Sequence, residues 1–318
     1  MFSTGSPCIR LEQLVISRSA NLHSLSNDIG ELFPCLHQLT IRDCFRLDQL
    51  PDNITALSGL KCATVTGSHR LRSLPEDFGQ MPALKTPMLE NLPLRKLPDS
   101  LCQATSLEKL VLHDCCWIDQ LPADFCSLTS LRTLSLKSIW LKVLPERIGW
   151  LSNLENLHLH HCTNQRLFPS LAQLISLTSL ELGKCAVTVL PEGLDNLINL
   201  QHLNIHDSDA LTEIPNSIAG LTSLVTLIIE GCQQLSLLPR RLSSLMELKC
   251  LRITRCSQLC GFLMSLPRLL EVMSWFCNGQ ADSPRQISLL PCLRDLELGL
   301  ADNVHEFPIP LGSLSQLR

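Results

Sequence analysis

The chain contains no tyrosine, and aromatic residues make up only 4% of its 318 residues. Proteins that hold single-stranded nucleic acid stack its bases on aromatic side chains, and few are available here. The net charge is also small, -4 at neutral pH, so the chain lacks the positive excess that binds a phosphate backbone. The sequence therefore predicts no nucleic-acid partner.

Long apolar runs are missing as well. No segment reaches the roughly 18 consecutive apolar residues that a membrane-spanning helix needs. The first residues, MFSTGSPCIRLEQL, contain neither a basic leader nor an apolar core of signal-peptide length. We therefore expect no membrane insertion.

Leucine is abundant, and it recurs in a fixed pattern. In LENLHLHHC, residues 154–162, the frame is L-x-x-L-x-L-x-x-C. In the general pattern a Leu-Pro follows, with Phe-Pro or Ile-Pro in some repeats, and then two aliphatic residues. Most steps between successive frames are 23 or 24 residues, which is typical of a leucine-rich-repeat solenoid. The first leucines of the frames are Leu11, Leu36, Leu60, Leu84, Leu107, Leu131, Leu154, Leu177, Leu200, Leu224, Leu248, Leu269 and Leu293.

The pattern predicts an α/β fold, a curved horseshoe of about 13 repeats. Alternation within L-x-L directs the leucines into the core and their neighbours to solvent, as in a strand. One strand per repeat, always in the same direction, gives a parallel sheet, which we expect on the concave face. Segments such as PERIGWL, residues 145–151, predict short helical turns on the convex face, because proline presets the first turn.

Residues 1–10 form a short lead-in, and residues 11–318 form a single repeat domain. The repeat is irregular at 84–94, where Pro87 replaces an inward leucine, and we expect a local gap in the sheet because proline donates no hydrogen bond. It is irregular again at 259–292. The last repeat is incomplete and lacks a polar cap, so we expect the sequence to be part of a longer polypeptide or a truncated gene product.

Seven of the 16 cysteines share the last position of the strand frame. A small buried thiol suits that position, where it can hydrogen-bond the backbone of the following turn. Free thiols held in a repeated array indicate a reducing compartment, so we expect a cytoplasmic protein, with a nucleocytoplasmic distribution left open. The seven are Cys44, Cys115, Cys162, Cys185, Cys232, Cys256 and Cys277.

The complete repeat is clearest in ALTEIPNSIAGLTSLVTLIIEGCQQLSLLP, residues 210–239. It resembles the repeats of plant intracellular leucine-rich-repeat proteins, above all the repeat region of nucleotide-binding leucine-rich-repeat disease-resistance proteins. It is also similar to the plant Ras-group leucine-rich-repeat proteins. The resemblance spans residues 11–318. It implies a ligand-sensing or autoinhibitory module whose partner is a pathogen effector, a guarded host protein or the receptor's own domains.

We expect function at the positions that alternate with the inward leucines, since they vary in chemistry on a constant frame. One candidate cluster is rich in histidine. His158, His160 and Glu181 are close enough to hold a metal, but solvated histidines explain the group, so no metal site is assigned; His206, nearly 10 Å from His160, is too far to join. A pH-sensitive interface is an alternative role. The cluster comprises His113, His158, His160, Glu181, His202, Asn204 and His206.

A second candidate cluster lies near the carboxy-terminal end and comprises Arg252, Met273, Trp275 and Glu297. A tryptophan exposed among arginine and methionine has the composition of an interface anchor. The alternative is that Trp275 turns inward. The other tryptophans, Trp117, Trp140 and Trp150, are expected to be packing residues.

Signals of catalysis are missing from the sequence. It contains no G-x-S-x-G elbow, no zinc-type pair of C-x-x-C motifs and no G-x-x-x-x-G-K-[ST] phosphate loop. We therefore expect a non-catalytic protein-recognition module without a cofactor. A free-standing signalling scaffold and the substrate-selecting repeats of a bacterial effector are the alternatives, and the ligand and the oligomeric state stay open.

Overall fold

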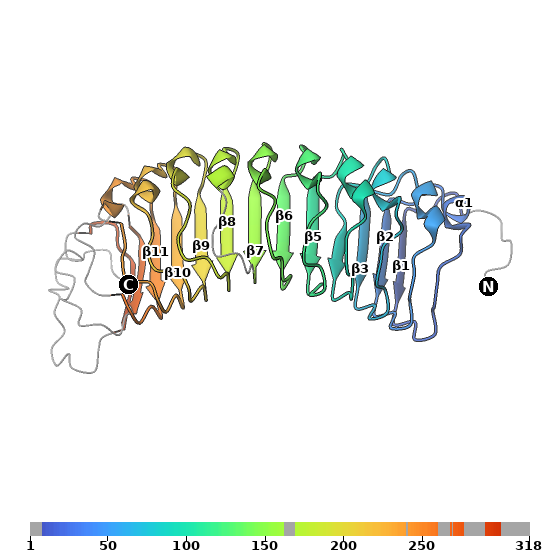
Figure 1. Ribbon diagram of the computed structural model, residues 1–318, viewed down its shortest axis with the longest axis horizontal. Coiled ribbons are helices and arrows are strands. Elements are labelled where there is room, and N and C mark those ends of the chain that lie inside the picture. The colour runs from blue at the N-terminus through green and yellow to red at the C-terminus, as the bar shows by residue number, and fades with distance from the viewer. Residues whose placement is uncertain are drawn as a thin grey trace. The chain divides into compact units, whose positions relative to one another are not determined.

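The computed structural model describes residues 8–161, 169–239, 241–259, 268, 270–276 and 290–299. The chain divides into two compact units, Met1–Asn156 and Leu157–Arg318. Each unit repeats one motif, in which a strand is followed by a tight turn and then by a short helical segment that leads back to the next strand (Figure 1).

In the described part of the amino-terminal unit, six parallel strands pair in chain order. They are β1 (Gln13–Ser17), β2 (Gln38–Arg42), β3 (Cys62–Thr66), β4 (Met88–Glu90), β5 (Lys109–His113) and β6 (Thr133–Lys137). The helical segments are α1 (Ile29–Leu32), η1 (Asp52–Ala56), η2 (Phe78–Gln80), η3 (Asp99–Gln103), η4 (Phe125–Ser127) and η5 (Ile148–Trp150).

The carboxy-terminal unit continues the same motif, and its first strand begins at the last residue of the preceding unit. Its strands are β7 (Asn156–His160), β8 (Ser179–Gly183), β9 (His202–His206), β10 (Thr226–Glu230), β11 (Cys250–Thr254), β12 (Val272–Phe276) and β13 (Asp295–Gly299). Its helical segments are η6 (Pro169–Gln173), η7 (Leu194–Asn196), η8 (Asn216–Gly220) and η9 (Leu242–Ser244).

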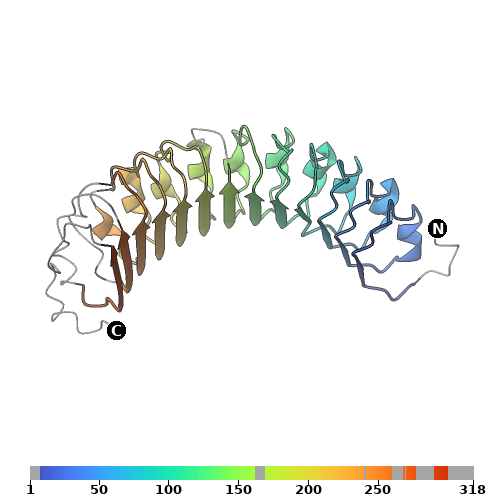
Figure 2. The same ribbon diagram turned by 90° about the horizontal axis from the view of Figure 1, so that it is seen from below.

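Strands and helical segments form two layers within each unit, with the leucines between them (Figure 2). The first leucine of the frame is fully buried in every described repeat from Leu36 to Leu248, as the sequence predicts. The two inward residues are buried too in β2, β3 and β5 to β11, for example Leu203 and Ile205 of β9. The repeated leucines therefore form the core, and the fold is a leucine-rich-repeat solenoid.

The returning segments are almost all 3₁₀ helices of three to five residues, and α1 is the one α-helix among the described residues. A 3₁₀ helix rises about 2.0 Å per residue, against 1.5 Å in an α-helix, so a few residues span the distance to the next strand. Proline starts the turn, since the carbonyl of Pro51 accepts a hydrogen bond from the amide of Ile54 at 3.0 Å. No helix in the described ranges is long and apolar enough to cross a membrane.

A left-handed residue and a buried cysteine turn the chain at the end of a strand. The residue after each strand from β1 to β11 has a positive φ between 50° and 67°. One residue later, the thiol of Cys115 donates to the carbonyl of His113 at 3.4 Å, and the thiol of Cys185 donates to the carbonyl of Gly183 at 3.4 Å. The expected role of the frame cysteines is confirmed at Cys44, Cys115, Cys185, Cys232 and Cys256; Cys162 and Cys277 lie outside the described residues.

The irregularity at Pro87 shortens a strand but does not open a gap. Strand β4 has three residues, and it still pairs with β3 and β5. Pro87 itself is buried, and its carbonyl accepts a hydrogen bond from the amide of Val111 at 3.2 Å. Because proline has no amide hydrogen to donate, the strand is two residues shorter than its neighbours. The carbonyl of Pro87 still accepts a hydrogen bond, which holds β5 beside it.

The register of β12 differs from the sequence prediction by one residue. Met273 pairs with Leu251 and is 0% exposed, so it belongs to the core row and not to the exposed row. The first leucine of this repeat is Leu270, which is fully buried, rather than Leu269. The frame that begins at Leu269 places Cys277 in the cysteine position, whereas the frame from Leu270 places Asn278 there, which is why the pattern selected Leu269.

Candidate functional site

The exposed side of the strands β7–β13, here called the sheet face, carries most of the predicted site residues in rows. Residues of neighbouring strands that pair in register stand side by side on this face. One row contains Glu181, Asn204, Ile228, Arg252, Ser274 and Glu297. The next row contains Gly183, His206, Glu230 and Thr254.

Glu181 gathers three histidines around its carboxylate. Its Oε1 atom lies 3.0 Å from Nε2 of His160 and 3.5 Å from Nε2 of His206. Its Oε2 atom lies 3.8 Å from Nδ1 of His158. The four side chains are between 15% and 27% exposed, so solvent reaches a cluster that is largely enclosed by its neighbours.

His206 joins this cluster, contrary to the expectation that it lies too far from His160. The two rings meet edge to face with their centroids 4.9 Å apart. Gly183 stands between them on β8, and a Cβ atom there would come within 2.5 Å of the His206 ring and 2.8 Å of Nδ1 of His160. Because glycine has no side chain, the two rings can lean across the strand that separates them.

Asp207 holds the His206 ring from the other side. Its Oδ2 atom lies 3.3 Å from Nδ1 of His206. Asp207 is the residue directly after β9, and it has a positive φ, a conformation that aspartate tolerates better than most residues. Arg255 extends the network, with its guanidinium 4.0 Å from Asp207 and 2.6 Å from Glu230. The imidazole of His206 is therefore oriented by carboxylates at both ring nitrogens.

Two of the predicted histidines stand apart. His202 is exposed at the start of β9, four residues and roughly 13 Å from His206 along the strand. His113 lies in the amino-terminal unit, where its Nε2 atom is 2.9 Å from the hydroxyl of Ser135. Burial lowers the pKa of His113, because it disfavours the charged ring, although the Glu90 carboxylate acts in the opposite direction.

The sheet face is hollowed next to the cluster. The hollow has a volume of about 420 Å³ and contains four of the predicted site residues, Asn204, His206, Arg252 and Glu297. Ser274 lies in the exposed row, where the sequence predicted Met273. Its hydroxyl donates a hydrogen bond to Glu297 at 3.1 Å. The residues that line the hollow are Asn204, His206, Ile228, Glu230, Arg252, Thr254, Arg255, Ser274 and Glu297.

Trp275 is described by its backbone alone. Its backbone pairs with Ile253, which is in the core row, and its side chain lies outside the described part of the chain. The second candidate cluster keeps Arg252 and Glu297 on the sheet face, whereas Met273 belongs to the core.

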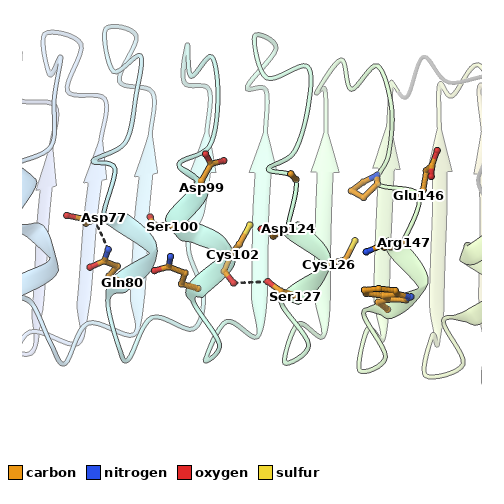
Figure 3. A pocket seen from close by; sticks show the side chains of 14 residues that line it. Asp77, Gln80, Asp99, Ser100, Cys102, Asp124, Cys126, Ser127, Glu146 and Arg147 are labelled. Carbon is orange, nitrogen blue, oxygen red and sulfur yellow. Dashed lines mark hydrogen bonds between the residues drawn. The ribbon is translucent and has the colours of Figure 1, made fainter.

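A groove on the helical side of the amino-terminal unit was not foreseen from the sequence. It has a volume of about 870 Å³ and crosses η2 to η5 (Figure 3). The guanidinium of Arg147 lies over the ring of Trp150, 4.5 Å from its centroid. Burial raises the pKa of the thiols of Cys102 and Cys126 to about 11, so neither is an activated nucleophile.

The three tryptophans that were expected to pack are exposed. Trp117, Trp140 and Trp150 have 70%, 61% and 55% of their surface open to solvent. The leucine frame assigns no inward position to these residues, and the core is already filled by leucine and isoleucine. Their large side chains therefore remain outside.

The parallel strands, the 3₁₀ returns and the leucine core define the chain as a repeat solenoid. It belongs to the leucine-rich-repeat family, since the model of the leucine-rich repeat region matches residues 110–212 and 157–301, together more than half of the chain. Domains of this family are typically non-catalytic, and they bind ligands that are often proteins or peptides. The chain is accordingly a leucine-rich-repeat protein-binding module.

Solved structures with this fold come from bacteria, plants and animals. The leucine-rich repeat domain of the type III effector XopL is 30% identical, with a TM-score of 0.60 over 64% of this chain and 72% of that chain. An internalin from Listeria monocytogenes is 18% identical, with a TM-score of 0.72 over 97% and 86%. The ectodomain of the Arabidopsis thaliana receptor kinase GASSHO1/SCHENGEN3 is 20% identical, with a TM-score of 0.62 over 92% and 42%.

A search of curated proteins found none that matches this chain. The family is therefore established by its repeats and by the solved structures, and neither points to one branch of it.

Proposed function

We propose that this chain is the ligand-sensing or autoinhibitory repeat region of a plant disease-resistance-type receptor, and that its protein ligand binds the sheet face over β9–β13. The observation that supports the site is the hollow of about 420 Å³, which contains Arg252 of β11 and Glu297 of β13, with Ser274 of β12 between them. A cavity lined by converging polar groups is the usual form of a recognition site.

The chemistry of the exposed row supports a protein ligand. Along one row the side chains change from carboxylate to amide, aliphatic, guanidinium, hydroxyl and carboxylate, while the core residues beside that row on β8 to β11 are all leucine or isoleucine. Arginine at such a position can donate several hydrogen bonds in a fixed plane to a carboxylate or a backbone carbonyl. We infer that Arg252 contacts an acidic or carbonyl-rich segment of the ligand.

The plant assignment is supported by the consensus residues of the repeat. The frame ends in cysteine and is followed by Leu-Pro, as in the plant intracellular repeats that the sequence resembles. The thirteen described cysteines are all free thiols, and a cytoplasmic location follows if they stay reduced. Pathogen effectors, guarded host proteins and the receptor's own domains are the partners that this assignment implies.

A second candidate is a bacterial effector whose repeats select a host protein. It is favoured by the 30% identity to the leucine-rich repeat domain of the type III effector XopL. The coding sequence next to the repeats distinguishes the candidates, since a nucleotide-binding module upstream supports the receptor and a separate catalytic domain supports the effector.

The site is tested by reversing its charges. The double variant Arg252→Glu, Glu297→Lys keeps the net charge, and we expect it to weaken association with the co-expressed upstream module at least about tenfold, as measured by interferometry. The matched control is Lys96→Glu, Glu76→Lys, which reverses an exposed ion pair of 3.3 Å in the other unit. Unchanged association of the first variant would remove the hollow from the binding site.

A further inference from the structure

We propose that His160, Glu181 and His206 form a binding site for a divalent transition metal, with Zn²⁺ as the best fit, on the sheet face of the carboxy-terminal unit. The proposal goes beyond protein recognition and assigns a second ligand to this surface. It is based on the separation of the donor atoms, on the orientation of one ring, and on a glycine that makes room for both rings.

The donor atoms are spaced as they are around zinc. Bonds of 2.0–2.1 Å in a tetrahedron place neighbouring ligand atoms about 3.3 Å apart. Oε1 of Glu181 lies 3.0 Å from Nε2 of His160 and 3.5 Å from Nε2 of His206. One donor atom from each of the three residues lies within 4.8 Å of the other two, so small rotations of the rings complete the geometry.

The ring of His206 is already turned for coordination. Its Nδ1 atom lies 3.3 Å from Oδ2 of Asp207, and its Nε2 atom faces Oε1 of Glu181 at 3.5 Å, so the tautomer with a proton on Nδ1 offers the lone pair of Nε2 to a metal. A ligating histidine typically donates its other N–H to a carboxylate, which fixes the tautomer and makes the ring a stronger donor. Asp207 is therefore assigned as the orienting partner of a metal ligand.

Gly183 is the residue that makes the site possible. The two histidines are on β7 and β9, and any side chain on the strand between them would occupy the space into which their rings lean. No positive φ requires glycine at this position, so the backbone alone does not explain it. The space that the two histidine rings occupy explains the glycine, because a side chain there would collide with both rings.

The choice of donors favours zinc over magnesium and calcium. Two imidazoles and one carboxylate suit zinc, whereas the hard cations prefer sets made entirely of oxygen. Three protein ligands leave a fourth position open to water or to a group from a bound partner. The side chains are 15% to 22% exposed, so an ion can enter directly from solvent. Because the ligands stand on three paired strands, little rearrangement is needed.

The proposal is tested by titrating the metal-free protein with Zn²⁺ in a calorimeter. We expect one equivalent to bind, and we expect the variants His160→Ala, His206→Ala and Glu181→Gln to weaken it by more than the roughly 10–100-fold that loss of an outer-shell partner causes. Asp207→Asn should weaken it about tenfold. His202→Ala is the matched control and should leave it unchanged, since that histidine lies on the same strand outside the cluster.

Gly183→Ala gives a test in which every ligand is kept. The added methyl group would press on both rings, and we expect a loss of affinity comparable to the loss of a ligand, with the circular dichroism spectrum unchanged. Equal affinity in this variant and in the wild type would contradict the assigned geometry.

Co²⁺ distinguishes this site from the thiols of the chain. Nitrogen and oxygen ligands give only the weak visible bands of tetrahedral Co²⁺, whereas thiolates add an intense near-ultraviolet charge-transfer band. Cys8, Cys35 and Cys116 are exposed and are the obvious competitors. A thiolate band, or binding that survives both His160→Ala and His206→Ala, would overturn the proposal.

Discussion

The imidazole rings of His160 and His206 are in contact, although they belong to strands that are separated by a third strand. Backbones two strands apart are nearly 10 Å from each other, and on that distance alone the rings should not meet. They meet because the residue between them is Gly183, over which both side chains lean. The spacing of a sheet therefore limits contacts between backbones more strictly than contacts between side chains.

The two sides of β9 should respond very differently to truncation. Leu203 is buried in the core, and Leu203→Ala removes its transfer free energy and leaves a cavity. We expect it to lower the free energy of unfolding by roughly 2–5 kcal/mol in a urea titration. His202→Ala, on the exposed side next to it, should stay within about 0.5 kcal/mol of the wild type. Similar losses for both variants would mean that the faces are assigned wrongly.

The leucine frame accounts for this division because inward positions accept one kind of side chain. At those positions the sequence predicts burial correctly, and the same constraint explains the frame cysteines, whose thiols reach a carbonyl two residues back. The frame fails where a cysteine fits it by coincidence. Residues 269 and 270 are both leucine, and Cys277 favoured the frame from Leu269, which shifted the exposed row onto Met273, a core residue.

The candidate site was predictable only in part, because contacts between its side chains also depend on neighbouring residues that have no functional group, such as glycine. The sequence identified His160, Glu181 and His206 as exposed, but their convergence depends on a glycine that looks like an ordinary strand-end residue. The hollow beside Arg252 was likewise hidden by the register of β12. Because the predicted register was wrong by one position, Met273 and Trp275 were assigned to the exposed row instead of Ser274.

Glycine is needed in the helical return at Gly79 because the chain of the next repeat passes over it. A Cβ atom there would lie 2.1 Å from the carbonyl oxygen of Ser100, and the amide of Gly79 donates to the Ser100 hydroxyl at 3.1 Å. Backbone cannot move away as a flexible side chain can, so Gly79→Ala should cost about 1–3 kcal/mol by thermal or urea unfolding.

Gly59 is the control for that prediction. A Cβ atom there would be 3.5 Å from its nearest neighbour, which is an ordinary contact, and its φ is not positive. Gly59→Ala should therefore be neutral or stabilise the protein by about 0.4–1 kcal/mol, since alanine has less freedom in the unfolded chain. If Gly59→Ala destabilised the protein as much as Gly79→Ala, the close approach would not be the cause.

Adjacent cysteines should differ sharply in reactivity. Cys115 is fully buried and donates to the carbonyl of His113, whereas Cys116 is exposed in the turn. We expect a brief pulse of iodoacetamide under native conditions to alkylate Cys116 and leave Cys115 intact, as read by peptide mass spectrometry. Labelling of both residues after unfolding in urea is the control. Equal labelling in the native state would show that the frame position is open to solvent.

Stability should fall at alkaline pH because burial keeps a thiol protonated. Burial raises the pKa of Cys115 from 9.0 to about 12. Between these values the unfolded chain releases a proton that the folded chain keeps, so the free energy of unfolding falls as pH rises, by about 1.4 kcal/mol per pH unit for this thiol. Below about pH 9 the contribution of Cys115 is fully present.

The variant Cys115→Ala isolates that contribution. Between about pH 9 and about pH 10, we expect it to lose roughly 1 kcal/mol less than the wild type in urea titrations under reducing conditions. Leu112→Ala is the control, because it weakens the same repeat and keeps the thiol, so it should lose as much as the wild type over this range. If Cys115→Ala and Leu112→Ala lost stability equally on raising the pH, the thiol would not be held protonated by the fold.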